Sequence, residues 1–196
     1  EAGSDAASLR TTARREGDHY VINGTKRYIT NAPVAHTFNV MARTDPEVKG
    51  ARGISSFIVE RETPGITLGS IDKKMGQSGS MTCDVIFEDV RVPAENIIGE
   101  EGEGFITAMK VLDRGRLHIS GVSIGVAKRL IADALDYAMQ RKQFGQPIAE
   151  QQLIQAMLAD SQTETYAAEC MTIETARRRD RNENVSTESS ACKLFA

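Results

Sequence analysis

The pattern of hydrophobic and polar residues changes character near the middle of the chain. In residues 1–98, short apolar or alternating segments are separated by turn-forming residues such as Asn, Gly, Pro and Asp. Short strands punctuated in this way are typical of an all-β sandwich or barrel. From Glu103 onward, apolar residues recur every three or four positions, which is the period of an amphipathic helix. The pattern predicts an α+β chain, with a β domain over residues 1–98 and helices over residues 99–196.

The β part predicts a hairpin close to its start. Residues 19–30 read HYVINGTKRYIT, with two β-prone runs on either side of Asn23-Gly24. This dipeptide favours a two-residue type I′ turn, because both of its central positions need positive φ. Further strands are expected within residues 36–44, 54–62, 66–71 and 83–93, with turns at residues 45–53 and 63–65.

The second part predicts an antiparallel four-helix bundle, of which the chain contains two complete helices and the start of a third. The first begins near Glu103, the second covers about residues 150–179, and the third begins near Thr187. A bundle of this extent leaves an apolar face bare, so we expect a longer chain or an obligate partner. Two stripes are expected to face the core: Phe105, Met109, Leu112, Arg116, Ile119, Ser123, Val126 and Leu130 on the first helix, and Leu153, Met157 and Asp160 on the second.

A charged segment interrupts the apolar pattern of the first helix. Residues 109–120 read MKVLDRGRLHIS, and Asp113 and Arg116 share one face because they are three positions apart. Buried charges are usually paired, so the residues alone favour a structural Asp–Arg pair. The alternative is that both side chains face a ligand cavity at the edge of the bundle.

Composition excludes several classes of function. The 196 residues carry a net charge of −3 with dispersed basic residues, which gives no footprint for nucleic acid or an anionic membrane. Three scattered cysteines favour a reducing compartment over a disulfide framework or a zinc site. No apolar run approaches the roughly 18 residues of a membrane span. We therefore expect no nucleic acid, no membrane insertion and no metal.

Six segments occur in an order that resembles the acyl-CoA dehydrogenase family over essentially the whole chain. They read EAGSDAASL, YVINGTKRYITNA, ISSFIVERETPGI, KKMGQSGSMTCDVIFEDVRVPAENIIGEEGEGF, MKVLDRGR and ALDYAMQRKQFGQPIAEQQLIQAMLAD. Members of that family are longer, so the resemblance implies their middle β domain and the first part of their C-terminal helical bundle. It also implies an FAD-dependent oxidoreductase of fatty acid β-oxidation that converts an acyl-CoA thioester to its trans-2-enoyl form.

The resemblance implies two groups of FAD contacts. Tyr28, Ile29 and Thr30 would lie against the isoalloxazine ring, with Tyr28 in place of the usual Trp and the Thr30 hydroxyl directed to flavin N5. Without the resemblance, the residues alone favour an ordinary β-branched and aromatic strand end over a cofactor contact. The second group would reach the FAD of a neighbouring subunit: Arg141, Lys142, Gln143 and Phe144, followed by Gln151 and Gln152, where the family usually has His-Gln.

The resemblance also implies contacts with acyl-CoA. The residues concerned are Ser4, Asp113, Arg114, Gly115 and Arg116. Some family members carry their catalytic Glu at the position of Gly115, and glycine cannot accept a proton. We therefore expect no catalytic residue in this chain, and a base in the later half of the bundle.

Partners and compartment follow from the same resemblance. Shared FAD contacts imply a homo-oligomer, either a dimer or a tetramer, and the expected electron acceptor is an electron-transferring flavoprotein. The expected compartment is the bacterial cytoplasm or the mitochondrial matrix. Two alternatives stay open at this point: an acyl-CoA oxidase, and a non-catalytic module that binds FAD or CoA or mediates oligomer contacts.

Overall fold

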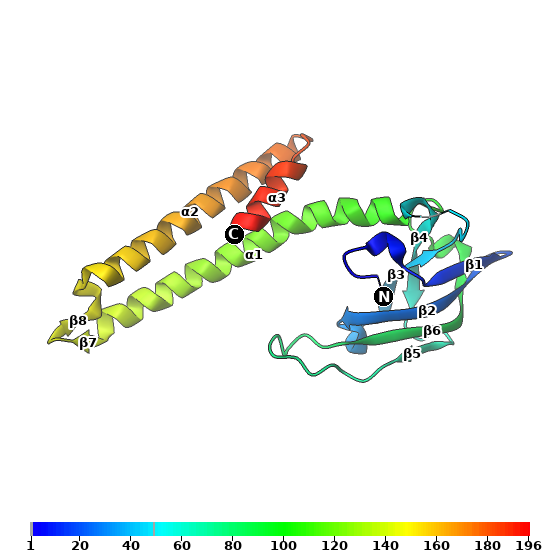
Figure 1. The fold of residues 1–196 in the computed structure, drawn as a ribbon, viewed down its shortest axis with the longest axis horizontal. Helices are drawn as coiled ribbons and strands as arrows, with labels where there is room; N and C mark the ends of the chain where they lie inside the picture. The colour runs from blue at the N-terminus through cyan, green and yellow to red at the C-terminus, as the bar shows by residue number, and fades with distance from the viewer. Residues whose placement is uncertain (1, 49) are drawn as a thin grey trace. The chain divides into compact units, whose positions relative to one another are not determined.

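The computed structural model describes residues 2–48 and 50–196 and divides into two compact units, Glu1–Met109 and Lys110–Ala196. The first unit contains strands β1–β6, and the second contains most of helix α1, the short strands β7 and β8, and helices α2 and α3 (Figure 1). The α+β class is thus confirmed. The domain boundary between residues 98 and 99 stays a prediction.

The first unit is built on one six-stranded sheet with the order β4-β3-β1-β2-β6-β5. Neighbouring strands are antiparallel except β1 and β3, which are parallel and meet at Thr12 and Arg43. Strand β1 is a strand that the hydrophobic pattern did not predict. The strands are β1 (Thr12–Glu16), β2 (His19–Thr30), β3 (Thr37–Arg43), β4 (Ile54–Glu60), β5 (Ile66–Leu68) and β6 (Thr82–Pro93).

The sheet is curled so that its two halves enclose a single core. The rings of Tyr20 on β2 and Phe57 on β4 have centroids 4.9 Å apart, although β2 and β4 are three strands apart in the sheet order. In a flat sheet that separation is about 14 Å, because neighbouring strands lie roughly 4.8 Å apart. The apolar residues of both halves therefore pack face to face, as the predicted sandwich or barrel requires. The core comprises Ala13, Tyr20, Ile22, Ala32, Phe38, Val40, Ala42, Phe57, Val59, Cys83, Val85, Phe87, Val90 and Val92.

The predicted hairpin at Asn23-Gly24 is wrong, because β2 continues through both residues. The pairing of β2 with β6 shifts register between Ile22 and Gly24, which marks a β-bulge. Gly24 has a φ of 141°, and a Cβ there would lie 2.8 Å from the Cα of Thr11. The Asn23 amide exchanges hydrogen bonds with the backbone and side chain of Asp89 at 2.9 and 3.0 Å. The glycine therefore permits a close approach between two backbones.

All three predicted helices are confirmed, as α1 (Gly104–Gln140), α2 (Gln152–Asp180) and α3 (Ser186–Phe195). A two-stranded hairpin of β7 (Lys142–Gln143) and β8 (Gln146–Pro147) joins α1 to α2 (Figure 1). Among the described residues, no helix has both the length and the apolar character needed to cross a bilayer.

The predicted core-facing stripes on the helices are wrong. The buried residues of α1 lie on a different line, which includes Leu117, Ser120 and Ile124. Leu130, a member of the predicted stripe, is 62% exposed. The predicted line on α2 is also exposed. The helix α1 is apolar on more than one face, and the bare face that we expected is confirmed by its exposed residues Val111, Leu112, Ile119, Val122, Val126 and Leu130.

Candidate functional site

The end of strand β2 has a strained backbone. Tyr28 has a φ of 56°, and the register between β2 and β6 shifts between Lys26 and Ile29. A bulky residue with positive φ is a genuine outlier. Its cost is of the order of 1–3 kcal/mol, and such residues cluster at functional sites. The bulge leaves the ring of Tyr28 66% exposed, and the side chain of Thr30 is exposed as well.

The strained segment is anchored to β6 and to the residue before it. Thr30 and Ile29 pair with Thr82 and Cys83 of β6, and the backbone N–H of Asn31 donates to the carbonyl of Met81 at 2.7 Å. An ion pair between Arg27 and Asp84 adds a side-chain link to β6. We infer that the backbone holds residues 28–30 firmly while two of their side chains remain open to another molecule.

Arg27 links the exposed ring to the sheet. Its guanidinium lies 5.2 Å from the centroid of the Tyr28 ring, and its Nε lies 3.5 Å from Oδ1 of Asp84 on β6. A cation over an aromatic face is attracted by the ring quadrupole. The contact therefore favours one orientation of the exposed Tyr28 ring.

A cavity of ≈ 880 Å³ lies beside this strand end. Residues from the N-terminal segment, from β2 and from Met41 line it, and its charged members are Arg10, Lys26 and Arg27. The Nζ of Lys26 donates a hydrogen bond to the carbonyl of Met41 at 2.6 Å, and burial lowers the pKa of Lys26 to about 8. Ser4 is exposed in the same N-terminal segment, whose residues Ala2, Gly3, Ala6 and Leu9 line the cavity.

The second predicted FAD group lies on the β7–β8 hairpin. Phe144 and Gly145 have φ values of 55° and 81°, as a type I′ turn requires at its two central positions. The side chain of Phe144 is 93% exposed. The Arg141 carbonyl accepts a hydrogen bond from the Ile148 N–H at 2.8 Å, which fixes the base of the hairpin. Sequence reasoning missed this turn, although Gly145 between two short polar runs was a usable signal.

The remaining predicted FAD contacts lie around that hairpin. The side-chain amide of Gln143 donates to the carbonyl of Lys142 at 2.7 Å. Gln151 occupies the N-cap position of α2 and Gln152 is its first residue. Arg141, Lys142 and Gln143 are all exposed. The hairpin and the start of α2 thus bring these predicted residues into one region of the helical unit.

The charged segment of α1 forms the pair that its spacing predicts. The guanidinium of Arg116 donates to the carboxylate of Asp113, and both side chains are half-buried. Asp113 and Arg114 also line a polar cavity of ≈ 530 Å³ together with the α2–α3 turn. At Gly115, a Cβ would meet no atom within 4 Å. The ion pair and the cavity are therefore both present, and they involve the same carboxylate.

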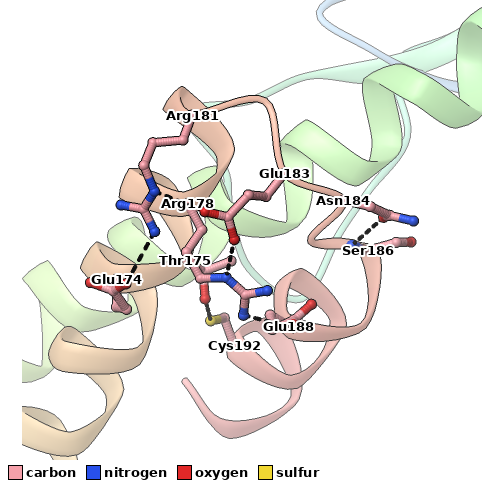
Figure 2. Close-up of polar contacts among 9 residues, drawn as sticks. All are labelled: Glu174, Thr175, Arg178, Arg181, Glu183, Asn184, Ser186, Glu188 and Cys192. Atoms are coloured by element: carbon pink, nitrogen blue, oxygen red, sulfur yellow. Dashed lines mark hydrogen bonds and ion pairs between the residues drawn. The ribbon is translucent and has the colours of Figure 1, made fainter.

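A network of ion pairs orders the α2–α3 turn, and sequence reasoning did not anticipate it (Figure 2). Arg178 donates to Glu183 and to Glu188, each at 2.8 Å, and Arg181 donates to Glu183 at 2.8 Å. Hydrogen bonds from Arg178 and Arg181 hold the pKa of Glu183 below its usual value. Because Glu183 also lines the polar cavity, the network fixes one of the cavity's walls.

Metal ligation is not a feature of the described residues. No group of three or more His, Cys, Asp and Glu side chains converges there in a way that would hold an ion. The cysteines Cys83, Cys170 and Cys192 are free thiols.

Comparison with known protein families identifies the family to which the chain belongs. The family model for the acyl-CoA dehydrogenase middle domain matches residues 1–90, and the model for the acyl-CoA dehydrogenase C-terminal domain matches residues 102–196. The chain belongs to the acyl-CoA dehydrogenase family. Proteins of this family are FAD-dependent oxidoreductases.

Individual relatives support the same assignment. The caffeyl-CoA reductase-Etf complex subunit CarC of Acetobacterium woodii is 45% identical over 195 residues, which are 100% of this chain and 51% of that protein. The cyclohexane-1-carbonyl-CoA dehydrogenase of Geobacter metallireducens is 44% identical, with 100% and 51% covered. The structure of butyryl-CoA dehydrogenase from Megasphaera elsdenii matches with a TM-score of 0.94 and 39% identity, over 99% of this chain and 51% of that one. The chain thus spans about half the length of these relatives.

Proposed function

We propose that this chain supplies the FAD and acyl-CoA contacts of an enzyme that converts an acyl-CoA thioester into the trans-2-enoyl-CoA. The observation that carries the proposal is the strained, exposed Tyr28 at the end of β2, at the position where the family places an aromatic residue against the flavin. A fold keeps a backbone cost of this kind only where the surroundings enforce it, and functional sites are where that happens most often.

The residues of the strand end fit a flavin. Tyr28 offers an exposed aromatic face for a planar ring, and Thr30 offers an exposed hydroxyl that can donate or accept a hydrogen bond. Bound FAD would accept a hydride from the β-carbon of the substrate. In this proposal Tyr28 limits how the ring tilts, and the Thr30 hydroxyl holds the edge that carries N5.

The hairpin residues fit the phosphate end of the cofactor. Arg141 and Lys142 place two cations beside each other on an exposed turn, and the planar fork of Arg suits phosphate oxygens. Phe144 is almost fully exposed in this chain, which suits a residue covered by a neighbouring subunit. We include Gln143, Gln151 and Gln152 in this contact, with the first two as departures from the family pattern.

We include the α1 segment and, separately, Ser4 among the residues that contact acyl-CoA. The Arg116 guanidinium fixes the Asp113 carboxylate, so that carboxylate reaches the ligand in one orientation. Arg114 lies on the same wall of the polar cavity and can meet an anionic group. Gly115 holds no proton acceptor, so we place the catalytic base in a part of the protein outside these residues.

The reverse reaction, reduction of an enoyl-CoA, is supported by the name of one relative. The relative from Acetobacterium woodii is named a reductase of caffeyl-CoA, whereas the relative from Geobacter metallireducens is named a dehydrogenase. Hydride transfer between flavin and the β-carbon is reversible, and the contacts described above serve either direction. The direction in the cell then depends on the electron partner, for which we propose an electron-transferring flavoprotein.

The test uses the full-length protein and its visible spectrum under anaerobic conditions. We expect a bound flavin whose absorption band bleaches when an acyl-CoA is added, and whose reduced form reoxidises when an enoyl-CoA is added. A protein that takes up no flavin overturns the proposal in favour of an interaction module. Rapid reoxidation of the bleached form by dioxygen alone indicates an acyl-CoA oxidase instead.

A matched pair of variants tests the role of Thr30. Thr30→Val removes the hydroxyl with little change in shape, and Thr37→Val makes the same change at an exposed strand position of β3. We expect the first variant to bleach more than tenfold more slowly, because the hydrogen bond acts on the flavin during hydride transfer. The second is expected to behave like the unaltered protein. Equal rates in all three proteins contradict the proposed contact.

Assembly and compartment are also proposals. Contacts shared between subunits through Arg141 and Phe144 require a homo-oligomer, so we expect a dimer or tetramer by sedimentation, and loss of flavin in Arg141→Gln. The relatives named above come from bacteria, which favours the bacterial cytoplasm over the mitochondrial matrix. A monomer that retains its flavin contradicts the shared site.

A further inference from the structure

Lys26 occupies an unusual position in the wall of the 880 Å³ cavity. It lies on β2, two residues before Tyr28, and its side chain is half-buried. Its Nζ donates one hydrogen bond, at 2.6 Å, to the Met41 carbonyl on β3. Within the described part of the chain, no carboxylate lies within ion-pair distance of this ammonium.

The surroundings of Lys26 favour its neutral form. Burial lowers its pKa to about 8. The other charged residues that line the cavity are Arg10 and Arg27, both cations, and the residues recorded around it include no Asp or Glu. At pH 8 Lys26 is a neutral amine in about half of the molecules, whereas a lysine with an ordinary pKa is neutral in roughly one molecule in 300. A neutral amine keeps an N–H for Met41 and has a free lone pair.

The same cavity is suited to a negatively charged reagent. Arg10 lies on the N-terminal segment and Arg27 on β2, so two segments of the cavity wall carry a cation besides Lys26. Acyl-CoA carries several phosphate charges on one end and a thioester on the other. The positive charge of the wall attracts such an anionic thioester toward the cavity, and the apolar lining residues Ala6, Leu9 and Met41 accommodate the acyl arm.

We propose that Lys26 is a site of covalent acylation by acyl-CoA thioesters. The Nζ lone pair attacks the thioester carbonyl carbon, a C–N bond forms, and the C–S bond breaks. The sulfur leaves as CoA thiolate, and the proton lost from nitrogen passes to solvent or to that thiolate. The products are an N-acyl-lysine amide and free CoA, and the step needs no oxidant or reductant.

Acylation at this position has a predictable consequence. The amide carries no charge, and its acyl chain occupies the cavity next to Tyr28. The cavity that Tyr28 lines then loses free volume. We expect the modified protein to bind flavin or substrate less well, so that excess thioester restrains the enzyme that consumes it. The proposal rests on the proposed function only for the presence of acyl-CoA.

The test is the rate of modification in the full-length protein, followed by peptide mass spectrometry with acetyl-CoA as the probe. The exposed lysines Lys73 and Lys110 are internal controls in the same sample. Part of the gain from the neutral fraction is lost because nucleophilicity falls with basicity, so we expect Lys26 to react on the order of tenfold faster at pH 8. Its rate levels off above pH 8, while the control rates continue to rise. Equal rates at Lys26 and the controls overturn the proposal.

A second probe separates the amine from the cavity. A short N-acetylcysteamine thioester has the same reactive group as acetyl-CoA but no phosphates. If Arg10 and Arg27 recruit the reagent, the preference for Lys26 over Lys73 falls severalfold with this probe. An unchanged preference overturns the role of the two arginines.

Variants connect modification to activity. Lys26→Arg keeps a cation that does not acylate, and we expect it to keep its activity during prolonged exposure to acyl-CoA, whereas the unaltered protein loses activity as Lys26 is modified. Loss at equal rates overturns the regulatory role. Should the variant fail to fold, the modification rates in the unaltered protein decide the matter alone. Acylation of Lys26 without flavin bleaching supports the acylation site and contradicts the proposed dehydrogenase activity. Flavin bleaching without acylation supports the dehydrogenase activity and contradicts the acylation site.

Discussion

The β unit and the helical unit differ in how completely they bury their apolar side chains. The curled sheet encloses fourteen buried residues in one cluster, to which five of its six strands contribute. In the helical unit, α1 leaves Val111, Val126 and Leu130 exposed along its length. The β unit therefore carries its stability within itself. The helical unit buries Leu117, Ile124 and Ala168 but leaves one apolar face of α1 exposed.

Both units hold an exposed aromatic residue in the left-handed region of φ, but in different settings. The positive φ of Tyr28 lies at the edge of the self-contained core, where pairing with β6 and the Asn31 hydrogen bond to Met81 hold the backbone. A cost of about 1–3 kcal/mol is affordable there because the surrounding core is already complete. Phe144 of the helical unit has nearly the same φ, 55°, but it lies in a two-residue hairpin turn that requires positive φ at that position.

The largest expected effect comes from removing a ring of the core. Phe57→Ala deletes a fully buried ring in the β unit and is expected to cost about 3–5 kcal/mol of the free energy of unfolding. Leu130→Ala on the exposed face of α1 is expected to change the stability of this chain by no more than about 0.5 kcal/mol. Urea denaturation of both variants makes the comparison. A large loss for Leu130→Ala would show that the helical face is already covered.

The next largest effect is expected in how the free energy of unfolding changes with pH, because Lys26 has a lowered pKa. The folded-state pKa is about 8, against 10.5 for the reference lysine, so the unfolded chain binds more protons between these values. Stability therefore rises with pH across this window, and the penalty for burying the charge is fully present below pH 8. The upper limit of the rise is about 3 kcal/mol at 1.36 kcal/mol per pKa unit. In Lys26→Met this rise is absent, and an identical pH profile in both proteins contradicts the assignment.

Two glycine substitutions compare backbone crowding in the two units. Gly24→Ala places a Cβ against the backbone before β1 and is expected to cost about 1–3 kcal/mol. Gly121→Ala on α1 meets nothing within 4 Å and is expected to stabilise the chain by up to about 1 kcal/mol. Thermal unfolding followed by circular dichroism measures both. Shifts of the same sign in the two variants contradict the close approach at Gly24.

The smallest effect on stability is expected at Tyr28. Tyr28→Gly relieves the left-handed backbone, whereas Tyr28→Ala keeps that strain, and both remove the ring. We expect the glycine variant to be more stable than the alanine variant by about 0.5–1 kcal/mol. This difference is smaller than the full relief of backbone strain, because glycine also raises the conformational entropy of the unfolded chain. Chemical denaturation of the pair measures the difference. A more stable alanine variant would show that the backbone is not strained.

The hydrophobic pattern predicted the helices and most of the strands because those elements depend on local periodicity. Strand β1 was missed, since its residues Thr12–Glu16 carry three charges and little apolar signal. The error at Asn23-Gly24 has a tertiary cause, because Gly24 accommodates Thr11 and not a turn. The misplaced stripe on α1 arose because periodicity does not distinguish between two apolar faces of one helix.

The candidate site was predicted in a different manner. Its residues came from resemblance to a family, and the roles given to Tyr28, Arg141 and Arg114 stay predictions. The spacing of Asp113 and Arg116 did predict their ion pair, because it follows from helix geometry alone. The network around Arg178 joins two helices across a turn, and no local pattern contains that information.

The left-handed backbone at Tyr28 also bears on how this position can change over evolutionary time. Every side chain other than glycine and, to a lesser degree, asparagine or aspartate meets much the same steric penalty there. Exchanging one aromatic residue for another therefore leaves the folding free energy nearly untouched, while it alters the size and polarity of the exposed ring. The backbone penalty and the chemistry of the ring are therefore independent at this residue. One aromatic side chain can replace another without a compensating substitution elsewhere in the sheet.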